Sequence, residues 1–177
     1  MNNTKTIFKS LLIMIVAISL FTVSCSKDEG GTKTPTNPAQ PITITANSIT
    51  TAFQGLKTIT IGKMDFDFAS FDGTDAKRTM TGASSSTDDS ANFNADKIKA
   101  KFSGLKVDGA TVDAKVTTTS FPQATDNTAI DITITITPAS GNSFAAAEQL
   151  TPYTKTGENV VVTLKLSPES GKKWDGK

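Results

Sequence analysis

The residues of this chain that could carry acid–base chemistry are few, because the sequence has no histidine and only one cysteine. Histidine is the commonest general base, so its absence removes the usual route to catalysis near neutral pH. Asp65 and Asp67 are the remaining pair of interest, since alternate strand residues lie roughly 7 Å apart and paired carboxylates serve glycoside hydrolases. Phe66 and Phe68 alternate with these acids, which should therefore face water, where nothing favours acid catalysis. We expect no enzyme activity and no catalytic residue; the alternative is a small carboxylate-dependent hydrolase.

A second group of acidic oxygens lies in the segment Asp72-Gly73-Thr74-Asp75. Clustered carboxylate and hydroxyl oxygens are the ligands that Ca²⁺ prefers. The spacing does not match an EF-hand loop, whereas Asp-Gly is a common turn sequence. We therefore predict a turn here, and we expect neither a metal nor a cofactor.

Three lysines and one tryptophan are candidates for ligand contact. Lys97, Lys99 and Lys101 would form a basic stripe on a strand, suited to an anionic glycan. No aromatic residue is interleaved for base stacking, so we expect no nucleic-acid partner, and charged residues also protect exposed strand edges. Trp174 could stack on a sugar ring; the alternative is that it fills a pocket in the core.

The single cysteine, Cys25, follows an apolar run, LLIMIVAISLFTV, and precedes a polar stretch that begins with Ser26 and Lys27. Lys5 and Lys9 lie before the run, and Ser24 is a small residue at its end. This order is typical of a secretory signal peptide. A membrane-spanning helix needs roughly 20 apolar residues, so the run is too short to span a bilayer.

The segment Thr22-Val23-Ser24-Cys25 resembles the lipobox of bacterial lipoproteins, although Thr22 replaces the usual aliphatic residue. The resemblance implies that residues 1–24 are removed, that Cys25 is acylated, and that the lipid bilayer is a partner. The acidic stretch after Cys25 is similar to sorting signals of surface lipoproteins. We therefore expect an exported, lipid-anchored protein, with the outer membrane or the cell surface as the favoured location.

The rest of the chain divides into a tether and one domain. Residues 25–41 contain Gly30-Gly31 and several prolines with few apolar side chains, which predicts a disordered tether. Residues 42–177 have the size of a single domain, and without a further cysteine its stability must come from apolar burial. The whole chain has a net charge of +1; without Lys5 and Lys9 the charge is about −1, which favours no anionic partner.

Alternation of apolar and polar residues predicts a mainly β domain. It is clearest at residues 130–137 and 160–166, and Met64, Phe66 and Phe68 repeat it. A sheet with one buried face and one solvent-exposed face is typical of antiparallel strands. Asp72-Gly73, Asp108-Gly109 and Ser140-Gly141 are predicted turns, and residues 82–92 a polar loop.

Two internal similarities refine this expectation. ITTAFQGLK (49–57) is similar to IKAKFSGLK (98–106), and ITITITPASGNSF (132–144) is similar to VTLKLSPESGKKW (162–174), which matches Phe144 with Trp174. These strand-and-turn units resemble strand ends of immunoglobulin-like and fibronectin-type sandwiches of bacterial surfaces. The resemblance implies a single antiparallel β-sandwich, which we take as the expected fold.

Helices are the alternative for the first pair of similar segments. Ile49, Phe53 and Leu56 are spaced as on one helix face, as are Ile98, Phe102 and Leu105. An α+β fold with helices near 48–55 and 96–104 is therefore the alternative to strands. A further short helix is predicted over 143–150, capped by Ser143 or Asn142.

These patterns together predict a non-catalytic binding, structural or antigenic module held on an envelope membrane. Its partner would be an envelope protein or a glycan; the alternative to an independent module is an accessory subunit of an envelope complex.

Overall fold

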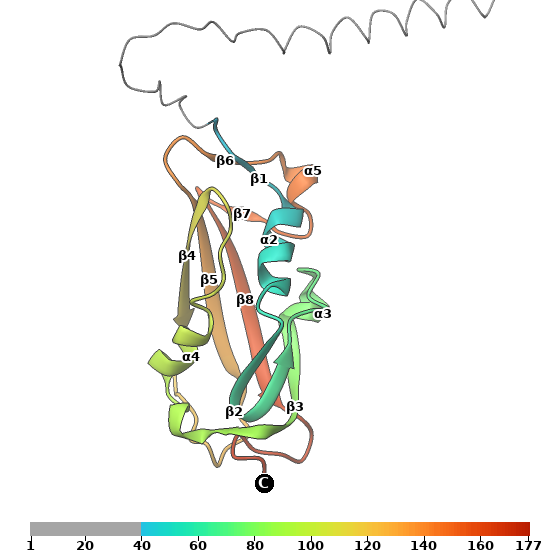
Figure 1. Cartoon of the computed structure of the whole chain (residues 1–177), viewed down its shortest axis with the longest axis vertical. Helices are drawn as coiled ribbons and strands as arrows, with labels where there is room; N and C mark the ends of the chain where they lie inside the picture. Colours follow the sequence, from blue (N-terminus) through green and yellow to red (C-terminus); the bar gives the residue numbers. More distant parts are fainter. Residues whose placement is uncertain (1–39) are drawn as a thin grey trace, which may run out of the picture. The chain divides into compact units, whose positions relative to one another are not determined.

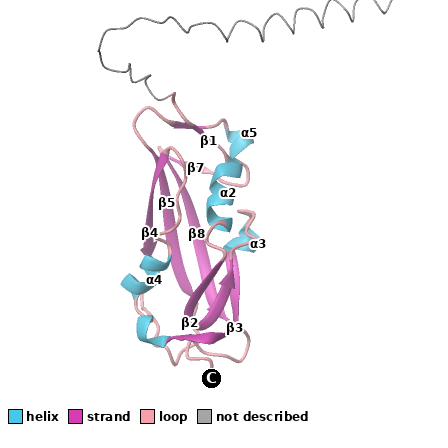
Figure 2. Ribbon diagram, in the orientation of Figure 1, coloured by secondary structure: helices cyan, strands magenta, loops and turns pink. Residues whose placement is uncertain are grey.

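The computed structural model describes residues 40–177 (Figures 1 and 2). The predicted signal peptide, Cys25 and nearly all of the predicted tether lie outside the described residues. In chain order, the elements are β1 (Thr43–Ile44), α2 (Ala46–Gln54), β2 (Thr58–Asp67), α3 (Asp75–Arg78), β3 (Thr79–Asp89), the 3₁₀ turn η2 (Ser90–Asn92), α4 (Ala95–Lys101), β4 (Ala110–Val116), β5 (Ile130–Pro138), β6 (Ser143–Phe144), α5 (Ala147–Leu150), β7 (Lys155–Thr156) and β8 (Asn159–Pro168). No helix within residues 40–177 is long and apolar enough to cross a membrane.

The main sheet confirms the prediction of a mainly β domain, but its strands are not all antiparallel. Its order is β2-β3-β8-β5-β4, and β7 pairs with β8. β3 runs parallel to β8, whereas the other pairs of this sheet are antiparallel. The expectation of a purely antiparallel sheet was therefore wrong. A long connection that contains α4, β4 and β5 separates β3 from β8, and parallel neighbours require such a crossover.

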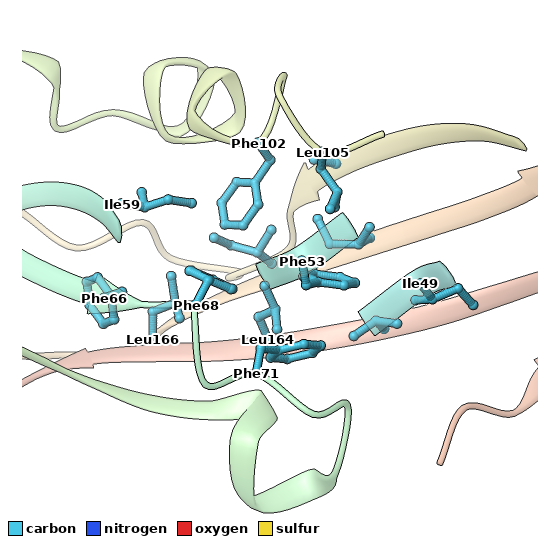
Figure 3. Packing of buried hydrophobic residues seen from close by; sticks show 14 of the residues in the cluster. Ile49, Phe53, Ile59, Phe66, Phe68, Phe71, Phe102, Leu105, Leu164 and Leu166 are labelled. Carbon is cyan, nitrogen blue, oxygen red and sulfur yellow. The ribbon is translucent and has the colours of Figure 1, made fainter. Parts of the chain in front are cut away.

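Alternation along β5 and β8 decides which face of the sheet is buried. The even-numbered residues from Ile130 to Ile136 and from Val160 to Leu166 have no exposed surface. Ile49 and Phe53 of α2 belong to the same apolar cluster, as do Phe102 and Leu105 (Figure 3). The odd-numbered residues of β5 and β8 are half-buried or exposed. The helices therefore pack on one face, and the opposite face meets solvent.

Residues 46–54 and 95–101 are helices, so the strand expected over 98–106 was wrong and the helical alternative is confirmed. Thr45 caps α2: its Oγ1 accepts from Ser48 N at 3.3 Å, and Ser48 Oγ accepts from Thr45 N at 3.0 Å. Asn94 caps α4 by accepting a hydrogen bond from Lys97 N at 3.0 Å. The residues before Phe102 fit both the two-residue period of a strand and the 3.6-residue period of a helix. The cap at Asn94 and the burial of Ile98 and Phe102 in the core favour the helix.

Two further local predictions were wrong. The expected loop over 82–92 contains most of β3, whose polar Ser and Thr residues lack apolar alternation. β3 pairs with β8 through residues 79–82 and with β2 through residues 83–89. The helix expected over 143–150 is only the turn α5, and Ala146, rather than Ser143 or Asn142, precedes it without a side-chain cap. Asn142 instead joins two loops, because its Oδ1 accepts from Ile42 N and its Nδ2 donates to Gly109 O, each at 2.9 Å.

Candidate functional site: a threonine-rich sheet face

The three lysines singled out in the sequence lie on α4 rather than on an edge strand. Lys99 Nζ is 3.3 Å from Asp113 Oδ1 of β4, and both side chains are more than half exposed. Lys101 Nζ is 2.6 Å from Asp89 Oδ2 at the end of β3. Lys97 is exposed on the same helix. The lysines therefore form no stripe along a strand, and two of them tie α4 to the sheet.

Trp174 is fully buried, in agreement with the interpretation that it fills a core pocket. Its ring lies 5.9 Å from Phe66 and 5.4 Å from Phe93, between centroids. Its Nε1 donates to Thr128 O at 3.0 Å. A side chain at Gly62 would collide with Trp174, since a Cβ there would lie 2.3 Å from Trp174 O. Phe144 is only half-buried, so the two aromatic residues are not equivalent.

The acidic residues do not converge on one site. Asp65 accepts from Thr60 Oγ1 at 2.6 Å, and Asp67 accepts from Ala69 N at 2.8 Å. Asp72 accepts from both the hydroxyl and the backbone N–H of Thr74, and these hydrogen bonds lower the pKa of Asp72. The Asp72-Gly73 segment is the predicted turn, with Gly73 at φ +80°. Within residues 40–177, no group of three acidic residues is placed to hold a metal ion.

A part-buried polar cluster around Tyr153 joins several elements, and no sequence pattern predicted it. Tyr153 Oη lies 2.8 Å from Thr50 Oγ1 of α2. The Arg78 guanidinium lies 5.6 Å from the centroid of the Tyr153 ring and donates to Pro152 O at 3.2 Å. Burial raises the pKa of Tyr153, against the opposing effects of Thr50 and Arg78. These contacts hold α2 and α3 to the segment before β7.

The open face of the sheet carries an array of threonine side chains. We call it the threonine face and define it by the outward threonines of the adjacent strands β3, β8, β5 and β4. They are Thr79, Thr81, Thr163, Thr133, Thr135, Thr137, Thr111 and, just after β4, Thr117. Asp113, Lys115, Asp131 and Lys165 lie among them on the same face.

The strand register places some of these threonines opposite one another on neighbouring strands. Thr133 is opposite Thr163 of β8 on one side and Lys115 of β4 on the other. Neighbouring strands lie about 4.8 Å apart, and alternate residues of one strand about 6.8 Å apart. Thr117 Oγ1 is 3.3 Å from Thr133 Oγ1, so some hydroxyls already contact each other. The face therefore mixes threonine hydroxyls, which both donate and accept hydrogen bonds, with charged side chains and with Val161, which is opposite Thr135.

A hollow of about 360 Å³ adjoins the threonine face where β2 ends and β3 pairs with β8. Its polar lining includes Asp67, Lys77 and Ser70, together with Thr79 and Thr81 of the threonine face. Lys77 Nζ lies 3.4 Å from Ser70 Oγ. Phe71 and Met80 add apolar surface. A hollow of this size with mixed lining suits one small polar group of a larger ligand.

Sequence reasoning missed the threonine face, although the alternation in β5 and β8 already assigned its threonines to a wet side. The missing information was the strand order, which places β3 and β4 beside β8 and β5. Comparison with known proteins adds no assignment: no protein-family model, curated protein or solved structure matches this chain.

Proposed function

We propose that this chain is an exported lipoprotein whose folded domain is a non-catalytic module that binds an envelope glycan on the threonine face. The observation that carries the ligand class is the set of outward-facing threonines on adjacent strands, which are half-buried or exposed. Sugars present rows of hydroxyls that pair with groups able both to donate and to accept. The threonine methyl groups and the apolar part of the hollow supply contact for the C–H faces of sugar rings.

The anchor in this proposal is Cys25. The charged start, the apolar run and Ser24 converge on that thiol, and two or more acyl chains give stable membrane attachment. The lipid bilayer is then the first partner, at the outer membrane or the cell surface. Cys25→Ala should abolish fatty-acid labelling and leave the signal peptide attached. Labelling that persists in Cys25→Ala would contradict the anchor without bearing on the glycan.

The immunoglobulin-like sandwich remains a hypothesis about the fold class. The β-rich composition supports it, whereas α2, α4 and the parallel pair β3–β8 depart from it. The glycan proposal does not depend on that resemblance, because it rests on the threonine face and the adjoining hollow.

The test of glycan binding removes hydroxyls from the centre of the face while keeping side-chain shape. The double variant Thr133→Val/Thr135→Val should weaken binding of the full-length protein to isolated envelope polysaccharide at least tenfold, since each lost hydrogen bond contributes about 1 kcal/mol. Thr58→Val is the matched control, because Thr58 is exposed at the start of β2, outside the threonine face. Equal binding by the double variant and the control, or no binding by the unaltered protein, would overturn the proposal.

A further inference from the structure

The free edge of β4 offers unpaired backbone groups. Within residues 40–177, β4 pairs with β5 alone. Thr117 N donates to Asp131 O, and Ala139 N donates to Gly109 O, each at 2.8 Å. The direction of backbone hydrogen bonding alternates from residue to residue along an antiparallel strand. These bonds therefore show that the N–H and C=O groups of the odd-numbered residues of β4 point to β5. Val112, Ala114 and Val116 therefore direct their N–H and C=O groups to the free edge.

The side chains of β4 have a self-complementary order around Ala114. Asp113 and Lys115 flank Ala114 and are exposed on the outer face, whereas Val112 and Val116 point inward and are half-buried. Suppose that a second copy of β4 ran antiparallel to the first, with Ala114 opposite Ala114. Asp113 of each copy would then face Lys115 of the other copy. Val112 would then face Val116. The even-numbered residues, whose backbone groups are free, would form the hydrogen-bonded pairs.

We propose that this edge is a homodimer interface, in which two copies of the chain pair through β4 and join their sheets. The pairing is a two-fold interface that uses the same residues on both copies. The main-chain hydrogen bonds provide attraction, and the two Asp113–Lys115 pairs set the register. The outer edge of β4 also borders a hollow of about 510 Å³, lined in part by Leu105, Val107 and Val112, which has room for inward side chains of the second strand.

The contacts within one copy are compatible with this pairing. Asp113 is bound by Lys99 of α4 at 3.3 Å, but both side chains are largely exposed. Exposed ion pairs contribute little, so Asp113 can exchange Lys99 for Lys115 of the second copy at small cost. The interface of one strand pair is small, and its dimer should be weak in dilute solution. Attachment of both copies to one membrane would raise their effective concentration. Independently of any glycan, the two threonine faces would then be continuous.

The experiment exchanges the charges one at a time in the full-length protein purified in detergent, with mass measured by sedimentation equilibrium at matched detergent density. Asp113→Lys places lysine opposite lysine, and Lys115→Asp places aspartate opposite aspartate. Because opposite charges are replaced by like charges in two symmetric pairs, each variant should weaken dimerisation about tenfold or more. Lys99→Ala is the control and should dimerise as the unaltered protein does.

Mixing the two single variants provides the decisive measurement. Asp113→Lys and Lys115→Asp should form a heterodimer with each other, because both charge pairs are then restored in reverse. The double variant Asp113→Lys/Lys115→Asp should regain its homodimer for the same reason. A monomeric unaltered protein at high concentration, single variants that still dimerise, or a mixture that stays monomeric would each overturn the proposal. A glycan-binding result in either direction leaves this test unaffected.

Discussion

Trp174 closes the core at the C-terminal end of the described chain, and its removal is the clearest stability test at the scale of one residue. The side chain has no exposed surface and packs between Phe66 and Phe93. Trp174→Ala should lower the free energy of unfolding by about 3–5 kcal/mol, because it leaves a large cavity and an unpaired carbonyl at Thr128. Urea denaturation followed by circular dichroism measures this change.

Phe144 is the internal comparison for that prediction. It corresponds to Trp174 in the repeated sequence but is only half-buried. Phe144→Ala should therefore cost clearly less than Trp174→Ala, since less apolar surface is returned to water. Equal losses in the two variants would contradict the difference in packing.

Tyr153 should titrate at unusually high pH. Burial raises its pKa above 10.0, so the folded state holds the phenol proton more tightly than the unfolded state does. Its contribution to stability is complete below pH 10.0 and is lost as the pH rises through the pKa of the folded state. The chain has one tyrosine, so phenolate absorbance reports this group directly. A midpoint at or below 10.0 in the folded protein would contradict the burial, and Tyr153→Phe should remove the signal.

At the scale of one element, α4 depends on its cap. Asn94→Ala removes the hydrogen bond from Lys97 N and should lower the free energy of unfolding by about 1 kcal/mol, with faster amide exchange in α4. Asn94→Ser should retain most of the stability, because serine also caps helices well. Asn47→Ala is the control, because Asn47 is exposed within α2. This substitution should change the free energy of unfolding by no more than about 0.5 kcal/mol. Equal effects at both positions would argue against the cap.

At the scale of the whole molecule, residues 40–177 should fold without the segment that precedes them. Residues 40–177 contain an apolar cluster of their own, and the only cysteine, Cys25, lies outside this range. Isolated residues 40–177 should unfold in one cooperative transition that reductant does not change. Trp174 fluorescence and circular dichroism should give coincident curves. Separate transitions would mean that the preceding segment or a partner completes the core.

The parts of this fold that could be predicted are those decided by neighbours in sequence. Strict alternation from Ile130 to Ile136 was sufficient to identify β5 and its buried side. Residues 98–106 were ambiguous because Ile98, Ala100 and Phe102 also alternate with lysines, and only packing of Ile98 and Phe102 into the core selects the helix. β3 was missed because its polar residues give no period. Its strand conformation is imposed by the two neighbours with which it pairs.

Residue types and short spacings were enough to predict an export signal, a mainly β domain, the turns at Asp72-Gly73 and Asp108-Gly109, and the residues of β5 and β8 that face water. These properties depend on residue type and on spacings of a few positions. The strand order, the parallel β3–β8 pair, the threonine face and the free edge of β4 became visible in the folded chain alone. Each of these joins residues far apart in the chain, and pairing between distant strands depends on the burial of the whole core, which no local pattern encodes.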